Sequence, residues 1–313
     1  MILTSKQENP TLMNAILNTI VYADVFDYPL TAAQIHRYLT SLSATPAEVS
    51  ARLENLELEL RVLHCQKDGD FYLLAGRQNI LDTYRRRQLV ATKLWHQALR
   101  YGRIIASLPF VRMLAVTGSL AMDNAEENGD IDFLIVTSHE RVWLCRLLIL
   151  GVVWLAARRK VKLCPNYLIS ERSLGIPTQN LYSAHELTQM VPLAGMEIYQ
   201  QMRAQNSWSA NFLPNAVGLP ERAAPLIKGG YLPGLRKLLE IILLSPIGTR
   251  LEHFEMRRKI QKFSRANKGN PEALFSADMC KGHFNRHGQR TEKVLNERLV
   301  RLSQRKLGPQ VGD

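Results

Sequence analysis

The sequence predicts an α+β protein, with a mixed β-sheet core between an N-terminal unit of three helices and a hairpin and a C-terminal helical region. Three observations lead to this fold class. Apolar residues recur at helical spacing before residue 60, two apolar strands flank a polar loop between residues 113 and 136, and helical patterns return after residue 180. A chain of 313 residues is long enough for two or three compact units. We expect domains at residues 1–78, 79–180 and 181–313.

The first domain begins with a helix from Leu12, and Thr31 and Thr45 are suited to cap a second and a third helix. Two short extended runs follow, Val62–Gln66 and Phe71–Leu74, and the AspGly pair between them favours a hairpin. Three helices followed by a hairpin resemble the winged helix-turn-helix family, over about a fifth of the chain.

The third helix of this unit is acidic, because residues 48–59 contain one basic residue, Arg52, and four acidic ones, Glu48, Glu54, Glu57 and Glu59. Affinity for a phosphate backbone comes largely from Lys and Arg. We therefore interpret the unit as a protein-docking module, and DNA binding stays open as the alternative.

A connecting helix is predicted at about 79–105, and the motif that carries chemistry follows it. An apolar strand, Met113 to Val116, stops at Gly118-Ser119, and ten residues later Asp130-Ile131-Asp132 opens a second apolar strand. This arrangement resembles the signature of the DNA polymerase β-type nucleotidyltransferase superfamily, over about 60 residues.

The resemblance implies a site that binds a nucleotide with Mg²⁺ or Mn²⁺. Gly118 and Ser119 would bind the phosphates, because a glycine turn lets the backbone approach them and a helix expected from Leu120 would point its N-terminus at them. Asp130 and Asp132 would be the metal ligands and, like Asn166, catalytic residues. The implied reaction transfers a nucleoside monophosphate from an NTP, most simply ATP, to an unidentified acceptor and releases pyrophosphate.

The family usually supplies a third carboxylate from a later strand, and this sequence departs from that pattern. After a helix at about 140–160, the strand Val161–Ser170 offers Asn166 at that position, and an amide cannot accept a proton. Three interpretations stay open: the enzyme uses a single metal and activates the acceptor elsewhere, Glu171 replaces Asn166, or the protein is a catalytically impaired nucleotide-binding or docking protein. His185 and Glu186, on the following helix, are weaker site candidates.

Beyond the core we predict helices at 182–205, 232–244, 249–265 and 289–306, joined by an irregular segment at 206–230. The net charge is +12, and residues 250–313 hold 15 Lys/Arg against 7 Asp/Glu. Such a basic region favours a polyanionic partner, so nucleic acid is one class of acceptor and protein is another.

Four widely separated cysteines and a polar Met1–Pro10 predict reduced thiols in a cytoplasmic protein. The most apolar run, Leu147–Ala157, is shorter than the ~20 residues that a bilayer requires, so we predict a buried helix and no transmembrane segment. Cys280, His283 and His287 have a spacing that could hold zinc, with a helical histidine pair as the plainer alternative.

Overall fold

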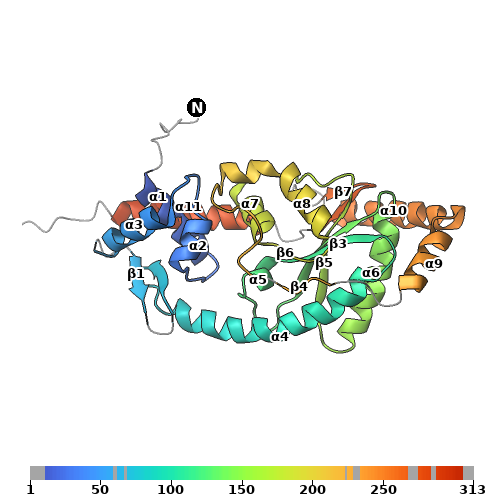
Figure 1. The fold of residues 1–313 in the computed structure, drawn as a ribbon, viewed down its shortest axis with the longest axis horizontal. Helices are drawn as coiled ribbons and strands as arrows, with labels where there is room; N and C mark the ends of the chain where they lie inside the picture. Colours follow the sequence, from blue (N-terminus) through green and yellow to red (C-terminus); the bar gives the residue numbers. More distant parts are fainter. Residues whose placement is uncertain are drawn as a thin grey trace, which may run out of the picture.

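The computed structural model describes residues 11–58, 62–66, 69–222, 224–227, 233–266, 274–282 and 287–305. The predicted α+β class is confirmed: helices surround a six-stranded mixed sheet and a separate two-stranded hairpin (Figure 1). In the described part of the chain, no helix is long and apolar enough to cross a membrane.

The N-terminal unit consists of three helices and a hairpin, at α1 (Leu12–Asp24), α2 (Ala32–Arg37), α3 (Pro46–Leu58), β1 (Val62–Cys65) and β2 (Phe71–Leu74). Both expected caps are present. Thr31 and Gln34 form a reciprocal capping box at the start of α2. At the start of α3, the Thr45 amide donates to Glu48 over 2.7 Å and the Glu48 amide donates back to the Thr45 hydroxyl. Lys67 and Asp68 of the hairpin turn lie outside the described residues.

The last helix, α11 (His287–Arg305), packs against this N-terminal unit. Leu295, Leu299 and Leu302 contact the core formed by α1, α2, α3 and the hairpin. Arg298 also pairs with Asp24 at the end of α1. The core of the first 76 residues is therefore completed by a helix from the other end of the chain.

A long helix, α4 (Ile80–Ala106), runs from the hairpin along one side of the molecule to the large sheet (Figure 1). The sheet has the order β6–β3–β4–β5–β8–β7. Its strands are β3 (Val111–Thr117), β4 (Ile131–Thr137), β5 (Leu163–Ser170), β6 (Val191–Ala194), β7 (Leu274–Phe275) and β8 (Met279–Lys281). Only β4 and β5 run parallel, and α6 (Val142–Ala157) connects them.

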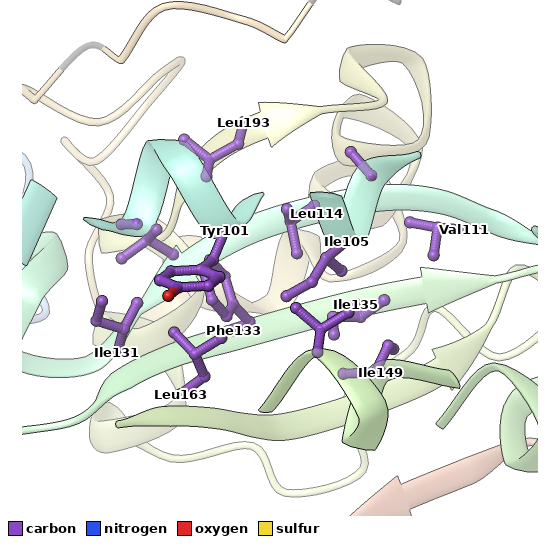
Figure 2. Close-up of a cluster of buried hydrophobic side chains, with 14 of the residues drawn as sticks. Tyr101, Ile105, Val111, Leu114, Ile131, Phe133, Ile135, Ile149, Leu163 and Leu193 are labelled. Atoms are coloured by element: carbon purple, nitrogen blue, oxygen red, sulfur yellow. The ribbon is translucent and has the colours of Figure 1, made fainter. Parts of the chain in front are cut away.

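Each face of the sheet has its own apolar core. On one face α4 and α6 cover β3, β4 and β5, and Figure 2 shows Tyr101, Leu114, Phe133 and Ile149 meeting there. On the other face α7 (Leu181–Gln189) and α8 (Met196–Gln205) supply Leu187, Tyr199 and Met202. One face of α6 is buried, but the apolar side chains of Trp154 and Leu155 on the other side are more than half exposed, so the predicted buried helix is buried only in part.

The prediction of one helix at 182–205 is wrong, because strand β6 divides it into α7 and α8. Pro192 cannot donate a helical hydrogen bond, and it lies on the edge strand opposite Ala115. Gly195 then turns the chain with φ 73°. A Cβ at this position would lie 2.1 Å from the Arg112 carbonyl oxygen, so only glycine lets the chain pass so close to β3.

The C-terminal region contains the predicted helices, as α9 (Pro233–Leu243), α10 (Pro246–Ala266) and α11, but it is not only helical. Strands β7 and β8 extend the sheet beside β5. The segment after α8 begins with a short 3-10 helix at Ser207–Asn211 and is otherwise without regular structure up to residue 222.

Candidate functional site

The GlySer turn follows the end of β3, and it lies against Asp132 near the start of β4. Gly118 has φ +66°, a backbone conformation that side chains disfavour. A Cβ at Gly118 would lie 2.7 Å from a carboxylate oxygen of Asp132, so a larger residue here would displace that carboxylate from its present position. The prediction of a helix that starts at Leu120 and points its N-terminus at phosphates is wrong about the length of that helix. Helix α5 (Gly118–Ala121) is a single turn, too short to develop the helix dipole that we expected to face phosphates.

Asp130 and Asp132 flank the first residue of β4, and Asp132 pairs with Thr117 of β3. Asp130 is exposed and Asp132 is half-buried. The ligand atoms of Asp130, Asp132 and Cys164 all lie within 4.8 Å of one another. The structure thus brings the two predicted aspartates together and adds a thiol that the sequence analysis did not single out.

Cys164 reaches this position through the register of the parallel pair β4–β5. Cys164 lies directly opposite Asp132, and the register then shifts, so that Leu134 lies opposite Tyr167. Asn166 falls within the shifted stretch, and it lines a small cavity beside the aspartates. Cys164, and not Asn166, is therefore the β5 residue that pairs with Asp132. The role of Asn166 in place of the family's third carboxylate stays a prediction.

Glu171, the alternative to Asn166, is not near the aspartates. It follows the far end of β5, about 20 Å along the strand from Cys164 at the usual rise per residue. There its carboxylate accepts a hydrogen bond from the His139 backbone amide and lies 3.6 Å from the His139 ring nitrogen. Glu171 therefore cannot serve as a ligand at this site.

The two aspartates bring negative charge together at a partly buried position. Burial, and next the charges of Asp130 and Glu186, raise the pKa of Asp132 to about 7. Burial and the two aspartates also raise the pKa of the Cys164 thiol far above its usual value, so this thiol stays protonated. A half-buried carboxylate with a raised pKa next to a second carboxylate is typical of a functional site, and a cation is the ligand that such a pair favours.

The small cavity beside the aspartates has a volume of about 20 Å³, the space of about one water molecule or ion. Thr117, Asn166, Ser183, Glu186 and Lys281 supply its polar lining. Lys281 is 6% exposed, and it comes from β8, where it pairs with Tyr167 of β5. A buried cation, Lys281, and a carboxylate, Glu186, therefore line the same cavity.

His185 and Glu186 are neighbours on α7 but have different surroundings. His185 is buried and stacks on Tyr22 of α1, with ring centroids 4.0 Å apart, so it belongs to the contact with the N-terminal unit. Burial lowers the pKa of His185 to about 3. Glu186 lines the small cavity and accepts a hydrogen bond from the Tyr182 hydroxyl over 3.2 Å. Of the two weaker candidates, only Glu186 faces the site.

A larger cleft of about 460 Å³ lies between the N-terminal unit and α5. Tyr28 and Tyr38 line one side, and Met122 and Asp123 line the other, so the cleft begins directly after the GlySer turn. Its size is in the usual range for small-molecule sites. His283 of the zinc hypothesis lies outside the described residues, so that hypothesis stays a prediction.

Comparisons of the chain with family models, with curated proteins and with solved structures found no match.

Two of the three side chains in the cluster, those of Asp130 and Asp132, fit a hard divalent cation. The carboxylates of Asp130 and Asp132 are the oxygen ligands that Mg²⁺ and Mn²⁺ prefer, and burial and the neighbouring carboxylates raise the pKa of Asp132. The Cys164 sulfur is a soft donor that suits these ions poorly. The two aspartates are therefore the better candidates for ligands, and Cys164 is a protonated neighbour.

Proposed function

We propose that this chain is a nucleotidyltransferase with a polymerase β-like core, a winged helix at its N-terminus and a site for NTP with Mg²⁺ or Mn²⁺. The observation that supports this most is the contact between Gly118 and the Asp132 carboxylate. It joins the GlySer turn and the AspIleAsp strand, the two halves of the sequence motif, in one site. The proposed nucleotide is ATP, and the proposed location is the cytoplasm.

In this proposal each described group has a role. Asp130 and Asp132 hold the cation, which would neutralise charge on the phosphates and on the departing pyrophosphate. The amides of Gly118 and Ser119 and the Ser119 hydroxyl donate hydrogen bonds to phosphate oxygens. Lys281 supplies positive charge at the small cavity, whose lining includes Thr117, the strand partner of Asp132.

The transfer step also requires a group that accepts a proton from the acceptor. The acceptor hydroxyl oxygen bonds to the α-phosphorus, the bond from that phosphorus to the bridging oxygen breaks, and pyrophosphate leaves. The Asn166 amide cannot accept the proton, and neither can a protonated Cys164 thiol. Glu186 is the carboxylate that faces the cavity, and we propose it as the base.

The acceptor is proposed as nucleic acid or protein, on the strength of the basic C-terminal region and the docking module. The test is incubation of the pure protein with each α-labelled NTP, Mg²⁺ or Mn²⁺ and a cell extract. We expect label on an acceptor with the wild type and none with Asp130→Asn. Glu186→Gln should bind nucleotide as the wild type does and transfer label about 10²-fold or more slowly, the usual contribution of a general base.

A specific observation favours the second function, a nucleotide-binding or docking protein without transfer. The residues of β5 nearest the aspartates are a thiol and an amide, where this kind of site usually has a third carboxylate. Binding of NTP with no labelled product under any of these conditions would favour the second function over the first.

A further inference from the structure

Helix α9 is attached to the molecule through its polar residues. Arg236 donates to the Val111 carbonyl over 2.7 Å and to the Ala106 carbonyl over 3.2 Å. Glu240 accepts a hydrogen bond from the Phe110 amide over 2.8 Å. No residue of α9 is buried. Arg236 and Glu240 thus face the protein, which reverses the usual arrangement of a surface helix.

The apolar residues of α9 point away from the protein, and those at the start of α10 join them. Ile241 is 61% exposed, Ile247 76% and Phe254 64%. We call the whole set the α9–α10 apolar face: Leu235, Leu238, Leu239, Ile241, Ile242, Leu244, Ile247, Leu251 and Phe254. Figure 1 places α9 and α10 together at the end of the molecule opposite the N-terminal unit. Exposed apolar groups on this scale mark an interaction surface.

The charge around this face is positive. Residues 233–266 contain eight Lys/Arg and three Asp/Glu. The three acidic side chains are all engaged: Glu240 as above, Glu252 with the Trp143 and Leu144 amides, and Glu255 with Arg258. Exposed cations remain on both helices, at Lys237, Arg250, Arg257, Lys262 and Arg265. An occupant of this surface must therefore accept apolar side chains and carry negative charge.

We propose that the α9–α10 apolar face binds the surface of an anionic lipid membrane. An amphipathic helix with Leu, Ile and Phe on one side and basic residues beside it lies in the headgroup region, where both kinds of side chain are satisfied. A second copy of this chain fits less well, because its basic residues would oppose those of the first copy. Nucleic acid would satisfy the cations but would leave the leucines without a partner. The inference does not depend on the proposed function.

The test is sedimentation of the full chain with vesicles of phosphatidylcholine mixed with phosphatidylglycerol, and with vesicles of phosphatidylcholine alone. We expect binding to the anionic vesicles that weakens with added salt, and little binding to the neutral ones. The double variant Leu238→Gln/Ile242→Gln should bind the anionic vesicles about tenfold or more weakly, because two exposed apolar side chains no longer enter the lipid. The matched control is Leu89→Gln, at a residue of α4 that is 69% exposed. It should bind as the wild type does.

Three results would overturn the proposal. The wild type could fail to bind anionic vesicles at low salt, or the α9 variant could bind as well as the control. Alternatively, gel filtration could show a wild-type dimer that the α9 variant converts to a monomer, which would make a second copy the occupant. Both variants change only exposed side chains, so their melting temperatures should match that of the wild type, and this is measured first.

Discussion

Replacing Gly118 by alanine isolates the contact on which the site depends. Gly118 and Gly218 both have a positive φ of nearly the same value, +66° and +73°. A Cβ at Gly218 has no atom within 4 Å, whereas a Cβ at Gly118 lies 2.7 Å from the Asp132 carboxylate oxygen. Gly218→Ala is therefore a matched control, because it introduces the same backbone strain without touching the aspartate.

The expected magnitudes follow from this pair. Holding an alanine in the left-handed region costs roughly 1–2 kcal/mol, so both variants should lose about that much free energy of unfolding. The atom that the new Cβ meets in Gly118→Ala is the end of a side chain, which can rotate away at little further cost. That rotation displaces one of the two proposed metal ligands. The two variants should thus be similarly stable without ligand but respond differently to nucleotide.

The assay is thermal melting of wild type, Gly118→Ala and Gly218→Ala, each with and without Mg²⁺ and ATP. A ligand at about 100 times its dissociation constant stabilises the folded protein by about 2.7 kcal/mol. We expect this rise for the wild type and for Gly218→Ala, and a much smaller one for Gly118→Ala. An equal rise in both variants would show that the nucleotide does not depend on the Gly118–Asp132 contact.

Three further predictions concern residues in or near this core. The unfolded chain takes up a proton at His185 near pH 6.5, whereas the folded protein does so only near pH 3. Stability should therefore fall by up to about 5 kcal/mol as the pH drops across that window, and His185→Phe should reduce this fall in urea unfolding. Asn206 is buried and bonds to the Ile176 amide and the Leu174 carbonyl, so Asn206→Leu should cost at least about 3 kcal/mol in urea unfolding. Cys164→Asp should tighten Mg²⁺ binding in calorimetry more than Asn166→Asp does, because Cys164 lies opposite Asp132. A larger effect of Asn166→Asp would show that Asn166 stands where the family has its third carboxylate.

Elements with local causes could be predicted from the sequence. The starts of α2 and α3 follow from Thr31 and Thr45, because capping involves residues three positions apart. The turn at Gly118 and the pair Asp130 and Asp132 also follow from short spacings. These features depend on residues that are close together in the sequence, so the residue spacing alone is enough to predict them.

Features that depend on distant segments could not be predicted in the same way. Strand β6 forms because it pairs with β3, and the helical pattern of 182–205 hides that pairing. Lys281 reaches the cavity only because the three-residue strand β8 pairs with β5, more than a hundred positions earlier. Cys164 lies opposite Asp132, and the register of β4 and β5 shifts between Asp132 and Leu134. The periodicity of the β5 sequence does not reveal this shift.

The most direct test of the proposed site is the response of its two aspartates to ligand. Asp130→Asn removes a ligand and also relieves the repulsion that contributes to the raised pKa of Asp132. Asp130→Asn and Asp132→Asn should therefore melt at or slightly above the wild-type temperature without ligand, and the rise on adding Mg²⁺ and ATP should vanish in both. Asp82→Asn, at a residue 84% exposed on α4, should keep the full rise. Site variants that melt well below the wild type without ligand, or that keep the full ligand-induced rise, would contradict the assignment of a magnesium–nucleotide site to Asp130 and Asp132.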